Sequence, residues 1–268
     1  MSSSSSSNKV RLDRPAEAVA RLTITRPDAR NALDHDVLGA IADAMPSLDD
    51  GIETRCVILT GEGKAFSAGY DIAGIPADSF ESDAEALVAH PFTAALEAVA
   101  AHPWPVVGAL NGHALGGGLE LALCTDLRVC ARGAKLGMPP AKLGLIYGHT
   151  GLQRFIDAIG IPRTKELFLT GRNVGAERAE EIGLVHEVVD DTHLERAAVD
   201  LASEIAANAP ISMRGNKLAI ATLNSYDRVS PEQERELIAL RESSFASEDM
   251  REGIKAFGEK RKPEWRGR

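Results

Sequence analysis

Two glycine-bearing loops in this sequence carry residue types that can stabilise negative charge on an oxygen atom. The first is Phe66–Ile72, which reads Phe-Ser-Ala-Gly-Tyr-Asp-Ile, and the second is Gly116–Glu120, which reads Gly-Gly-Gly-Leu-Glu. Glycine lets the backbone approach a ligand closely, and the start of a helix leaves N–H donors without partners inside the helix. One N–H group from each loop would form an oxyanion hole, which stabilises the anion that develops when a carbonyl compound reacts.

Glu120 is the titratable residue placed to act beside such a hole. It follows Gly117 by three residues, so the two lie on the same face of a helix. A carboxylate beside an oxyanion hole is suited to proton transfer at the α- or β-carbon of a carbonyl compound. The competing interpretation is an acidic residue that only complements the dipole at a helix start. The three glycines before it favour a catalytic Glu120.

Buried strands and helices must hold both loops in place. Short apolar, β-branched runs predict strands at residues 19–25, 55–60, 105–110, 127–131 and 184–189. Apolar residues at helical spacing predict helices after Asn31, at 81–102 with a break at Pro91, at 119–125, 151–160, 163–169 and 176–182, and from 192 onwards. Asn31 is expected to cap the first of these helices. Both loops therefore follow strands, and the alternation predicts an α/β core with a helical tail.

The composition is that of an ordinary globular chain. Its 268 residues include 30 Lys and Arg against 39 Asp and Glu, which gives a net charge of −9. An acidic total argues against nucleic acid and anionic membranes as partners, because both attract basic surfaces. No apolar run approaches the ~20 residues of a membrane span. Cys56, Cys124 and Cys130 lack metal or disulfide spacing, so we expect buried free thiols and a cytoplasmic protein.

Common cofactor, metal and targeting motifs are absent from the sequence. The run Gly61–Lys64 (Gly-Glu-Gly-Lys) continues into Ala65, where a phosphate-binding loop needs Ser or Thr. No G-x-G-x-x-G dinucleotide fingerprint, G-x-S-x-G nucleophile elbow or H-E-x-x-H zinc motif occurs, so we expect no metal. Residues 1–8 begin with Met and six serines and have no apolar core, which predicts a disordered leader rather than a secretion signal.

Beyond the two loops, the sequence resembles the crotonase (enoyl-CoA hydratase/isomerase) superfamily over nearly its whole length after the leader. The segments that carry the resemblance are Thr25–Leu33, Val57–Gly61, Phe66–Ile72, Asn111–Ala122, Gly183–Val185, Glu252–Phe257 and Lys260–Pro263. The resemblance implies a ClpP/crotonase-like spiral of ββα turns at residues 9–195. It also implies a C-terminal helical trimerisation region at 196–268, so that the chain forms a homotrimer or a hexamer. The implied substrate is an acyl-CoA thioester, with no cofactor beyond its CoA moiety.

The resemblance also assigns roles to single residues of this chain. The backbone N–H groups of Tyr70 and Gly117 match the family's oxyanion donors, and Glu120 matches a catalytic glutamate. The positions that correspond to CoA contacts are Arg30, Ala32, Ala68, Ile72, Phe257 and Lys260. The last two match positions that reach the CoA of a neighbouring subunit. Arg30 is included because Asp28 stands where hydratases often carry a basic residue.

The end of the chain supports a role in CoA binding through its charge. Residues 255–268 hold six basic and two acidic residues, a local charge of +4 in an acidic protein. Such a segment attracts the phosphates of CoA, although a solvated helix end would have the same composition. The match of Phe257 and Lys260 to the family favours CoA binding.

One departure from the hydratase pattern decides the reaction that we expect. Hydratases of the superfamily use two glutamates to hold and activate water, and Pro140 stands at the position of the second. Methylmalonyl-CoA decarboxylases look similar here, since they also lack this glutamate and have a tyrosine aligned with Tyr147. Loss of CO₂ needs an oxyanion hole, a dry site and a later proton donor, but no base. Tyr147, Tyr70, His149 and protonated Glu120 all remain open as that donor.

We therefore expect a lyase of the methylmalonyl-CoA decarboxylase type, with Tyr147 among its catalytic residues. One alternative is an enoyl-CoA hydratase or isomerase of fatty-acid metabolism that works with Glu120 alone. A second, of another class, is a catalytically silent crotonase fold that binds acyl-CoA as a scaffold. The competing interpretation of Tyr147 is a packed ring whose hydroxyl caps a loop carbonyl.

Overall fold

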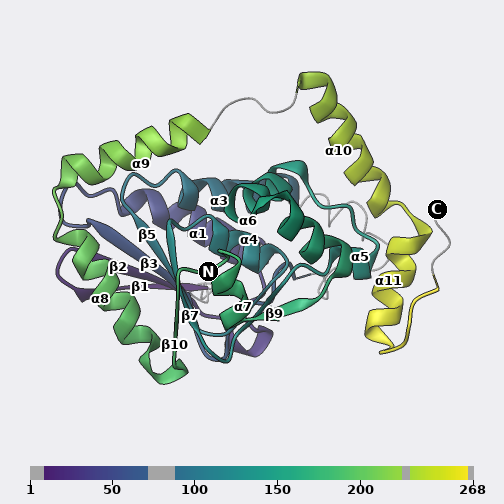
Figure 1. The fold of residues 1–268 in the computed structure, drawn as a ribbon, viewed down its shortest axis with the longest axis horizontal. Helices are drawn as coiled ribbons and strands as arrows, with labels where there is room; N and C mark the ends of the chain where they lie inside the picture. The colour runs from purple at the N-terminus through teal and green to yellow at the C-terminus, as the bar shows by residue number, and fades with distance from the viewer. Residues whose placement is uncertain (1–8, 72–87, 225–229, 265–268) are drawn as a thin grey trace, which may run out of the picture.

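The computed structural model of the chain describes residues 9–71, 88–224 and 230–264, which form two β-sheets surrounded by helices (Figure 1). The larger sheet has six strands in the order β1-β2-β3-β5-β7-β10. These strands are β1 (Val10–Ala16), β2 (Val19–Ile24), β3 (Cys56–Gly61), β5 (Val106–Leu110), β7 (Leu127–Ala131) and β10 (Glu187–Val189). β1 and β2 form an antiparallel hairpin, and every other neighbouring pair in this sheet is parallel.

The smaller sheet has four short strands in the order β4-β6-β8-β9. They are β4 (Ala65–Ser67), β6 (His113–Leu115), β8 (Lys135–Gly137) and β9 (Asn173–Gly175). β4, β6 and β8 run parallel, whereas β9 is antiparallel to β8. Each of the three parallel strands follows a strand of the larger sheet after a short connection, from β3 to β4, β5 to β6 and β7 to β8. This repeated step between sheets confirms the predicted spiral of ββα turns.

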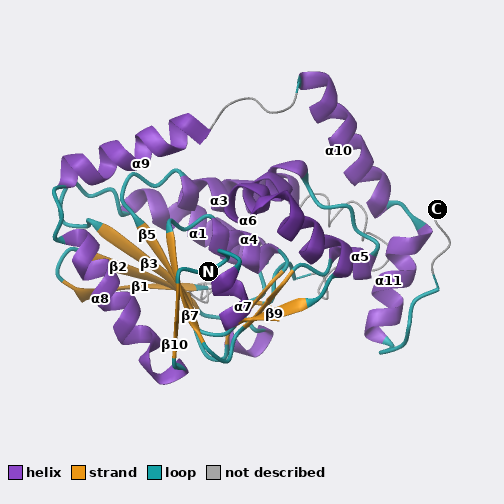
Figure 2. Cartoon of the chain, viewed as in Figure 1, coloured by secondary structure: helices purple, strands orange, loops and turns teal. Residues whose placement is uncertain are grey.

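Helices cover both faces of the larger sheet (Figure 2). The helices of the described residues are α1 (His35–Ser47), α3 (Thr93–Ala100), α4 (Gly117–Leu123), α5 (Pro140–Leu143), α6 (His149–Thr170), α7 (Ala176–Glu181), α8 (Leu194–Ala206), α9 (Pro210–Asn224), α10 (Pro231–Phe245) and α11 (Glu248–Gly258). Shorter helical turns are η1 (Pro27–Ala29), η3 (Val88–Phe92) and η4 (Asp191–His193). Among the described residues, no helix combines the length and the apolar character that a membrane span requires.

The alternation of side chains along β3 explains the two apolar clusters. Val57 and Leu59 point into the main core, which includes Leu38 of α1, while Ile58 points to the opposite face. There it packs in a second cluster with Ala198 of α8. The predicted domain boundary at residue 195 lies inside α8, and these contacts place α8 with the spiral core.

The smaller sheet brings the residues that the sequence singled out to one edge. Neighbouring parallel strands end at the same side of a sheet. Tyr70 lies shortly after β4, Gly117 follows β6 and begins α4, and Pro140 follows β8 and begins α5. Three segments that are far apart in the sequence therefore converge because their strands are adjacent and parallel.

The start of α1 differs from the prediction. Asp34, not Asn31, caps the helix, since its side chain accepts a hydrogen bond from Val37 N at 2.8 Å. Asn31 is fully buried, and its side-chain amide donates to Glu62 O at 2.9 Å and to Ala65 O at 2.7 Å. Both residues have the short polar side chain that caps helices, but Asn31 instead fastens its loop to the start of β4.

The remaining differences concern short elements and one helix. The strands of the smaller sheet and α5 were not predicted, because elements of three or four residues are too short for a periodic pattern. β1 was also missed, because its seven residues include three charged residues and a proline and form no apolar run. The predicted helices at 151–160 and 163–169 form α6, which is interrupted by non-helical angles at Gly160. The prediction of two separate helices therefore agrees with the break that the backbone of α6 has at Gly160.

A substitution at Gly118 tests how closely α4 and β4 must approach. A methyl group there would lie 2.6 Å from Ser67 O and 2.7 Å from Ser67 Cβ, so the two segments would have to separate. We expect Gly118→Ala to lower the free energy of unfolding by about 2 kcal/mol in urea titrations, as overpacking does. Gly39→Ala in α1 is the control, because its methyl group meets no atom within 4 Å. Equal stabilities of the two variants would contradict the close approach.

Candidate active site

The two glycine loops interlock at the edge of the smaller sheet. Gly69 has a positive φ of 89°, and a Cβ at this position would lie 2.6 Å from Leu115 O and 3.1 Å from Gly117 N. A Cβ on Gly117 would lie 3.2 Å from carbons of the Tyr70 and Phe92 rings. The loops after β4 and β6 therefore touch through backbone atoms, which only glycine permits at Gly69.

The predicted oxyanion donors lie where these loops meet. The Gly116 carbonyl starts the hydrogen-bond ladder of α4, because it accepts from Leu119 N and Glu120 N. Gly117 N–H comes before this ladder and has no partner within the helix. Tyr70 forms a parallel β-bridge with Leu33. Leu33 N donates a hydrogen bond to Gly69 O, and Leu33 O accepts one from Asp71 N. In such a bridge the N–H group of Tyr70 faces away from Leu33.

Glu120 and Tyr147 form a buried pair beside the loops. Glu120 is 4% exposed and Tyr147 is 8% exposed. The Tyr147 hydroxyl donates a hydrogen bond to Glu120 Oε2. Gly151, in the first turn of α6, allows this pairing, because a Cβ there would lie 2.5 Å from Tyr147 Cε1 and 2.9 Å from Glu120 Oε1. The structure thus brings together Tyr70, Gly117, Glu120 and Tyr147, the four predicted catalytic residues.

Burial sets the protonation of this pair. It raises the pKa of Glu120 to about 7, against the opposing effects of the Tyr147 hydrogen bond and the Arg154 charge. It also raises the pKa of Tyr147 well above its usual value, and the negative charge of Glu120 adds to this effect. Tyr147 consequently stays a hydrogen-bond donor, while Glu120 can change its protonation near neutral pH.

A cavity of about 100 Å³ opens beside Glu120. Tyr70, Phe92, Glu120, Tyr147 and Arg154 are among the residues that line it. The Tyr70 and Phe92 rings meet edge to face, with their centroids 4.6 Å apart. An apolar wall and a few convergent polar groups in a small concave space are the usual properties of a ligand site.

Sequence reasoning did not identify Arg154. Its Nε lies 3.7 Å from Glu120 Oε1, and its side chain is 30% exposed. The sequence signal was weak, since Arg154 is one of several charged residues on α6 and its partner lies on another helix. Arg154 follows Tyr147 by seven residues, but Tyr147 lies before the start of α6, so helical spacing gave no clue.

Two residues near the predicted site lie away from the cavity. Pro140 is buried at the first position of α5 and is absent from the cavity wall. His149 begins α6, but its Nε2 lies 3.5 Å from Glu234 Oε1 of α10. Of the four proton donors that the sequence left open, Tyr70, Tyr147 and Glu120 line the cavity and His149 does not.

Three of the predicted CoA-binding residues lie together next to the first loop. Ala68 N donates to Arg30 O at 3.0 Å, which joins the loop to the segment before α1. Ala32 is buried in the same segment, whereas the Arg30 side chain is exposed. Arg26, which sequence reasoning missed, holds this segment by donating to Ala32 O at 2.7 Å and to Asp71 Oδ2 at 3.0 Å.

The other predicted CoA-binding residues lie elsewhere in the chain. Ile72 falls outside the described residues. Phe257 is 73% exposed on α11, and Lys260 is exposed just after this helix. α11 packs on α5, where a Cβ on Gly253 would lie 2.7 Å from Leu143 O. Contacts of Phe257 and Lys260 with CoA stay a prediction.

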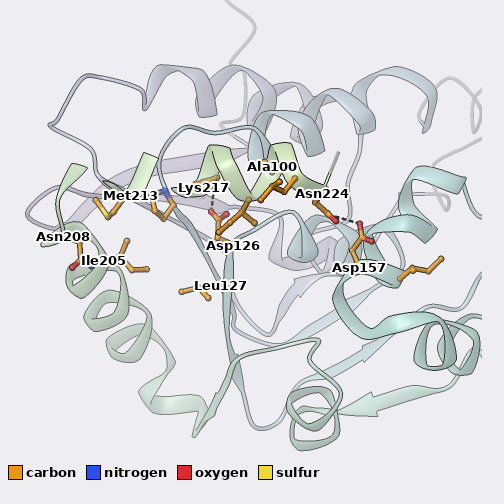
Figure 3. A pocket seen from close by; sticks show the side chains of 14 residues that line it. Ala100, Asp126, Leu127, Asp157, Ile205, Asn208, Met213, Lys217 and Asn224 are labelled. Carbon is orange, nitrogen blue, oxygen red and sulfur yellow. Dashed lines mark hydrogen bonds and ion pairs between the residues drawn. The ribbon is translucent and has the colours of Figure 1, made fainter. Parts of the chain in front are cut away.

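A larger cavity, of about 1000 Å³, lies between α9 and the body of the chain (Figure 3). Lys217 of α9 reaches across to Asp126 with an Nζ–Oδ2 distance of 2.6 Å, and Asn224 donates to Asp157 at 3.1 Å. None of the predicted site residues lines this cavity.

Comparisons with known proteins agree with the fold. The sequence pattern described as enoyl-CoA hydratase/isomerase matches residues 14–268. The short-chain-enoyl-CoA hydratase of Clostridium acetobutylicum is 35% identical over 259 residues, covering 96% of this chain and 97% of the relative.

A crystal structure of methylmalonyl-CoA decarboxylase complexed with 2S-carboxypropyl-CoA is similar with a TM-score of 0.88, at 27% identity over 100% of both chains. That of enoyl-CoA hydratase from Bacillus anthracis has a TM-score of 0.73, at 35% identity over 97% of this chain and 100% of the other. On this evidence, together with its spiral of ββα turns, the chain belongs to the enoyl-CoA hydratase/isomerase family.

Proposed function

We propose that this family member is an acyl-CoA lyase of the methylmalonyl-CoA decarboxylase type. The observation that carries the proposal is the partner of Glu120, which is the hydroxyl of Tyr147 and not a second carboxylate. Pro140, where hydratases have their second glutamate, lies off the cavity wall. One buried carboxyl group with a raised pKa is suited to donate a proton, whereas water activation by two glutamates needs a second carboxylate beside the first. The other carboxylate on the cavity wall, Glu97, is exposed.

The proposed reaction uses each of the four predicted catalytic residues. The thioester oxygen of the substrate lies between the N–H groups of Tyr70 and Gly117. The bond between the α-carbon and the carboxylate breaks, CO₂ leaves, and the electron pair forms the thioester enolate. Loss of one oxyanion donor typically lowers the rate about 10²- to 10³-fold. Protonated Glu120 then donates its proton to the α-carbon, while Tyr147 orients its carboxyl group.

Backbone similarity agrees with the family and leaves the reaction to the site. The methylmalonyl-CoA decarboxylase structure has a TM-score of 0.88 at 27% identity. An enoyl-CoA hydratase/isomerase from Pseudoalteromonas atlantica has a TM-score of 0.82 at the same identity. The proposal therefore depends on the surroundings of Glu120.

A hydratase or isomerase that uses Glu120 alone is the second candidate. The observation that favours it is the set of names carried by sequence relatives, among them the Clostridium acetobutylicum hydratase at 35% identity. In that reaction Glu120 would act as the base toward water or a substrate proton. The protonation state that each candidate requires of Glu120 is opposite, so the two can be separated by experiment.

CoA binding completes the proposed function. Arg30, Ala32 and Ala68 form the joined segment beside Tyr70, where the nucleotide and pantetheine arm would lie. Phe257 and Lys260 would contact the CoA of a neighbouring subunit, aided by the basic end of the chain. The reaction needs no cofactor beyond the CoA moiety of its substrate, because the thioester itself accepts the electron pair.

The proposed assembly is a homotrimer or a dimer of trimers. α9 exposes large apolar side chains in its described structure, namely Ile211, Leu218, Ile220 and Leu223, with exposed fractions of 89%, 68%, 69% and 74%. Large apolar side chains exposed in this number on one helix commonly mark a protein interface. Contact of α9 with further copies would remove these side chains from water.

A panel of acyl-CoA substrates tests the reaction. We expect CO₂ release from methylmalonyl-CoA or malonyl-CoA, without hydration of crotonyl-CoA, and slower turnover in Glu120→Gln, because the enolate must then take its proton from water. Hydration of crotonyl-CoA that is abolished by Glu120→Gln would establish the hydratase in place of the decarboxylase. Binding of the whole panel without turnover would establish the silent scaffold.

The pH dependence of kcat/KM gives an independent test. Because the pKa of Glu120 is raised to about 7, a decarboxylase that needs protonated Glu120 is active below pH 7 and loses activity as pH rises through this value. Tyr147→Phe removes a hydrogen bond that lowers the pKa of Glu120, so the fall should move to higher pH. An activity that instead rises through pH 7 would identify Glu120 as a base.

Substitutions on α9 test the assembly. We expect Ile211→Asp combined with Leu218→Glu to convert the assembly into monomers, as measured by light scattering during size-exclusion chromatography. Leu169→Glu is the control, because Leu169 is 75% exposed in the last turn of α6, twelve residues beyond Asp157, which accepts a hydrogen bond from Asn224 of α9. An unchanged mass of the α9 variant would show that the interface lies elsewhere.

A further inference from the structure

Arg154 has more binding capacity than its observed contact uses. A guanidinium group carries five N–H donors. Within the described part of the chain, Arg154 makes one ion pair, 3.7 Å from Nε to Glu120 Oε1, and donates no hydrogen bond. Its side chain is only 30% exposed, and it lines the cavity that contains Glu120 and Tyr147. A half-buried cation facing a small cavity is a binding element for an anionic group.

The size of the cavity limits what this anionic group can be. The cavity is small, at about 100 Å³. Such a space suits a short acyl group with one carboxylate better than a long acyl chain. Phe92 and Leu96 form an apolar part of the wall, which suits a methyl branch beside the carboxylate.

We propose that Arg154 exchanges carboxylate partners during the reaction, pairing with Glu120 in the free protein and with the carboxylate of the acyl group in the complex. This inference rests on the proposed function and adds to it the residue that recognises the free carboxylate of the substrate. It also explains why an acyl group with a carboxylate would be preferred, since a neutral acyl group leaves Arg154 paired with Glu120.

The exchange changes the charge balance around Glu120. The titratable and charged groups that face Glu120 are Tyr147, Arg154, Tyr70, Glu97 and Cys124. Burial disfavours the ionised form of Glu120, while the hydrogen bond from Tyr147 and then the charge of Arg154 favour it. Arg154 is the cation among these groups. When the substrate carboxylate takes this cation and adds its own negative charge, Glu120 binds a proton from solvent.

Each step then conserves atoms and charge. The bond from the α-carbon to the carboxylate carbon breaks, CO₂ leaves, and the electron pair passes into the thioester enolate. The proton on Glu120 moves to the α-carbon and gives the neutral acyl group. The Glu120 carboxylate that remains regains Arg154, which no longer has a substrate carboxylate to bind. Arg154 thus assists proton uptake before the reaction and proton release during it.

Binding of two unreactive CoA thioethers tests this exchange without any need for turnover. In 2-carboxypropyl-CoA a methylene group replaces the thioester carbonyl, and isobutyl-CoA carries a methyl group in place of the carboxylate. Calorimetry at pH 7.5, in buffers with different ionisation enthalpies, measures affinity and proton uptake together. For the unmodified protein we expect net proton uptake with 2-carboxypropyl-CoA and none with isobutyl-CoA.

Two arginine variants separate Arg154 from a general effect of charge. We expect Arg154→Met to weaken 2-carboxypropyl-CoA about 10- to 100-fold, the range for a charged hydrogen bond, to abolish proton uptake, and to leave isobutyl-CoA within about threefold. Arg163→Met is the matched control on α6, because Arg163 pairs with the exposed Glu166 and does not line the cavity. It should change neither ligand.

The outcomes distinguish this inference from the proposed function. Carboxylate-selective binding through Arg154 without release of CO₂ from methylmalonyl-CoA would support the exchange site and refute the reaction. Two results would refute the exchange and leave the reaction standing. One is release of CO₂ with no proton uptake when the unmodified protein binds 2-carboxypropyl-CoA. The other is release of CO₂ with an unchanged affinity of Arg154→Met for 2-carboxypropyl-CoA. The proton uptake of the unmodified protein decides the matter even where a variant does not fold.

Discussion

The contact between the loops that follow β4 and β6 is the constraint on which the site depends. Gly69 and Gly118 lie so close to backbone atoms of the opposite segment that a methyl group at either would collide with a carbonyl oxygen. This approach brings the Tyr70 peptide to the start of α4. The parallel order of β4, β6 and β8 then adds the segment that contains Tyr147 at the same edge.

The second constraint is the burial of Glu120. An ionised carboxylate is costly to remove from water unless it has partners. Tyr147 supplies a hydrogen bond and Arg154 a positive charge. Together they offset only part of the cost of burying the Glu120 carboxylate, so the pKa of Glu120 is raised to about 7. A fully compensated carboxylate would remain ionised and would not donate a proton. Incomplete compensation therefore keeps both protonation states accessible.

The sequence revealed those parts of the site that depend on backbone conformation. Gly69 and Gly117 were visible because close approach requires glycine, and Tyr147 became visible through the resemblance and the loss of the second glutamate at Pro140. Arg154 and Arg26 were missed because their partners, Glu120 and Asp71, lie on other elements and only the fold brings them near. The cap of α1 was assigned to the wrong residue because Asn31 and Asp34 have similar capping ability, and only the tertiary contacts of Asn31 separate them.

The shielding of Cys124 gives the site chemical durability. An acyl-CoA is an activated thioester, and a thiolate beside it would capture the acyl group by exchange, which would leave the protein acylated and inactive. Cys124 follows Glu120 by one helical turn, yet burial raises its pKa to about 12. At neutral pH this sulfur is a protonated thiol. A protein that binds an acyl-CoA can therefore carry a cysteine one helical turn from a buried carboxyl group without being acylated at its sulfur.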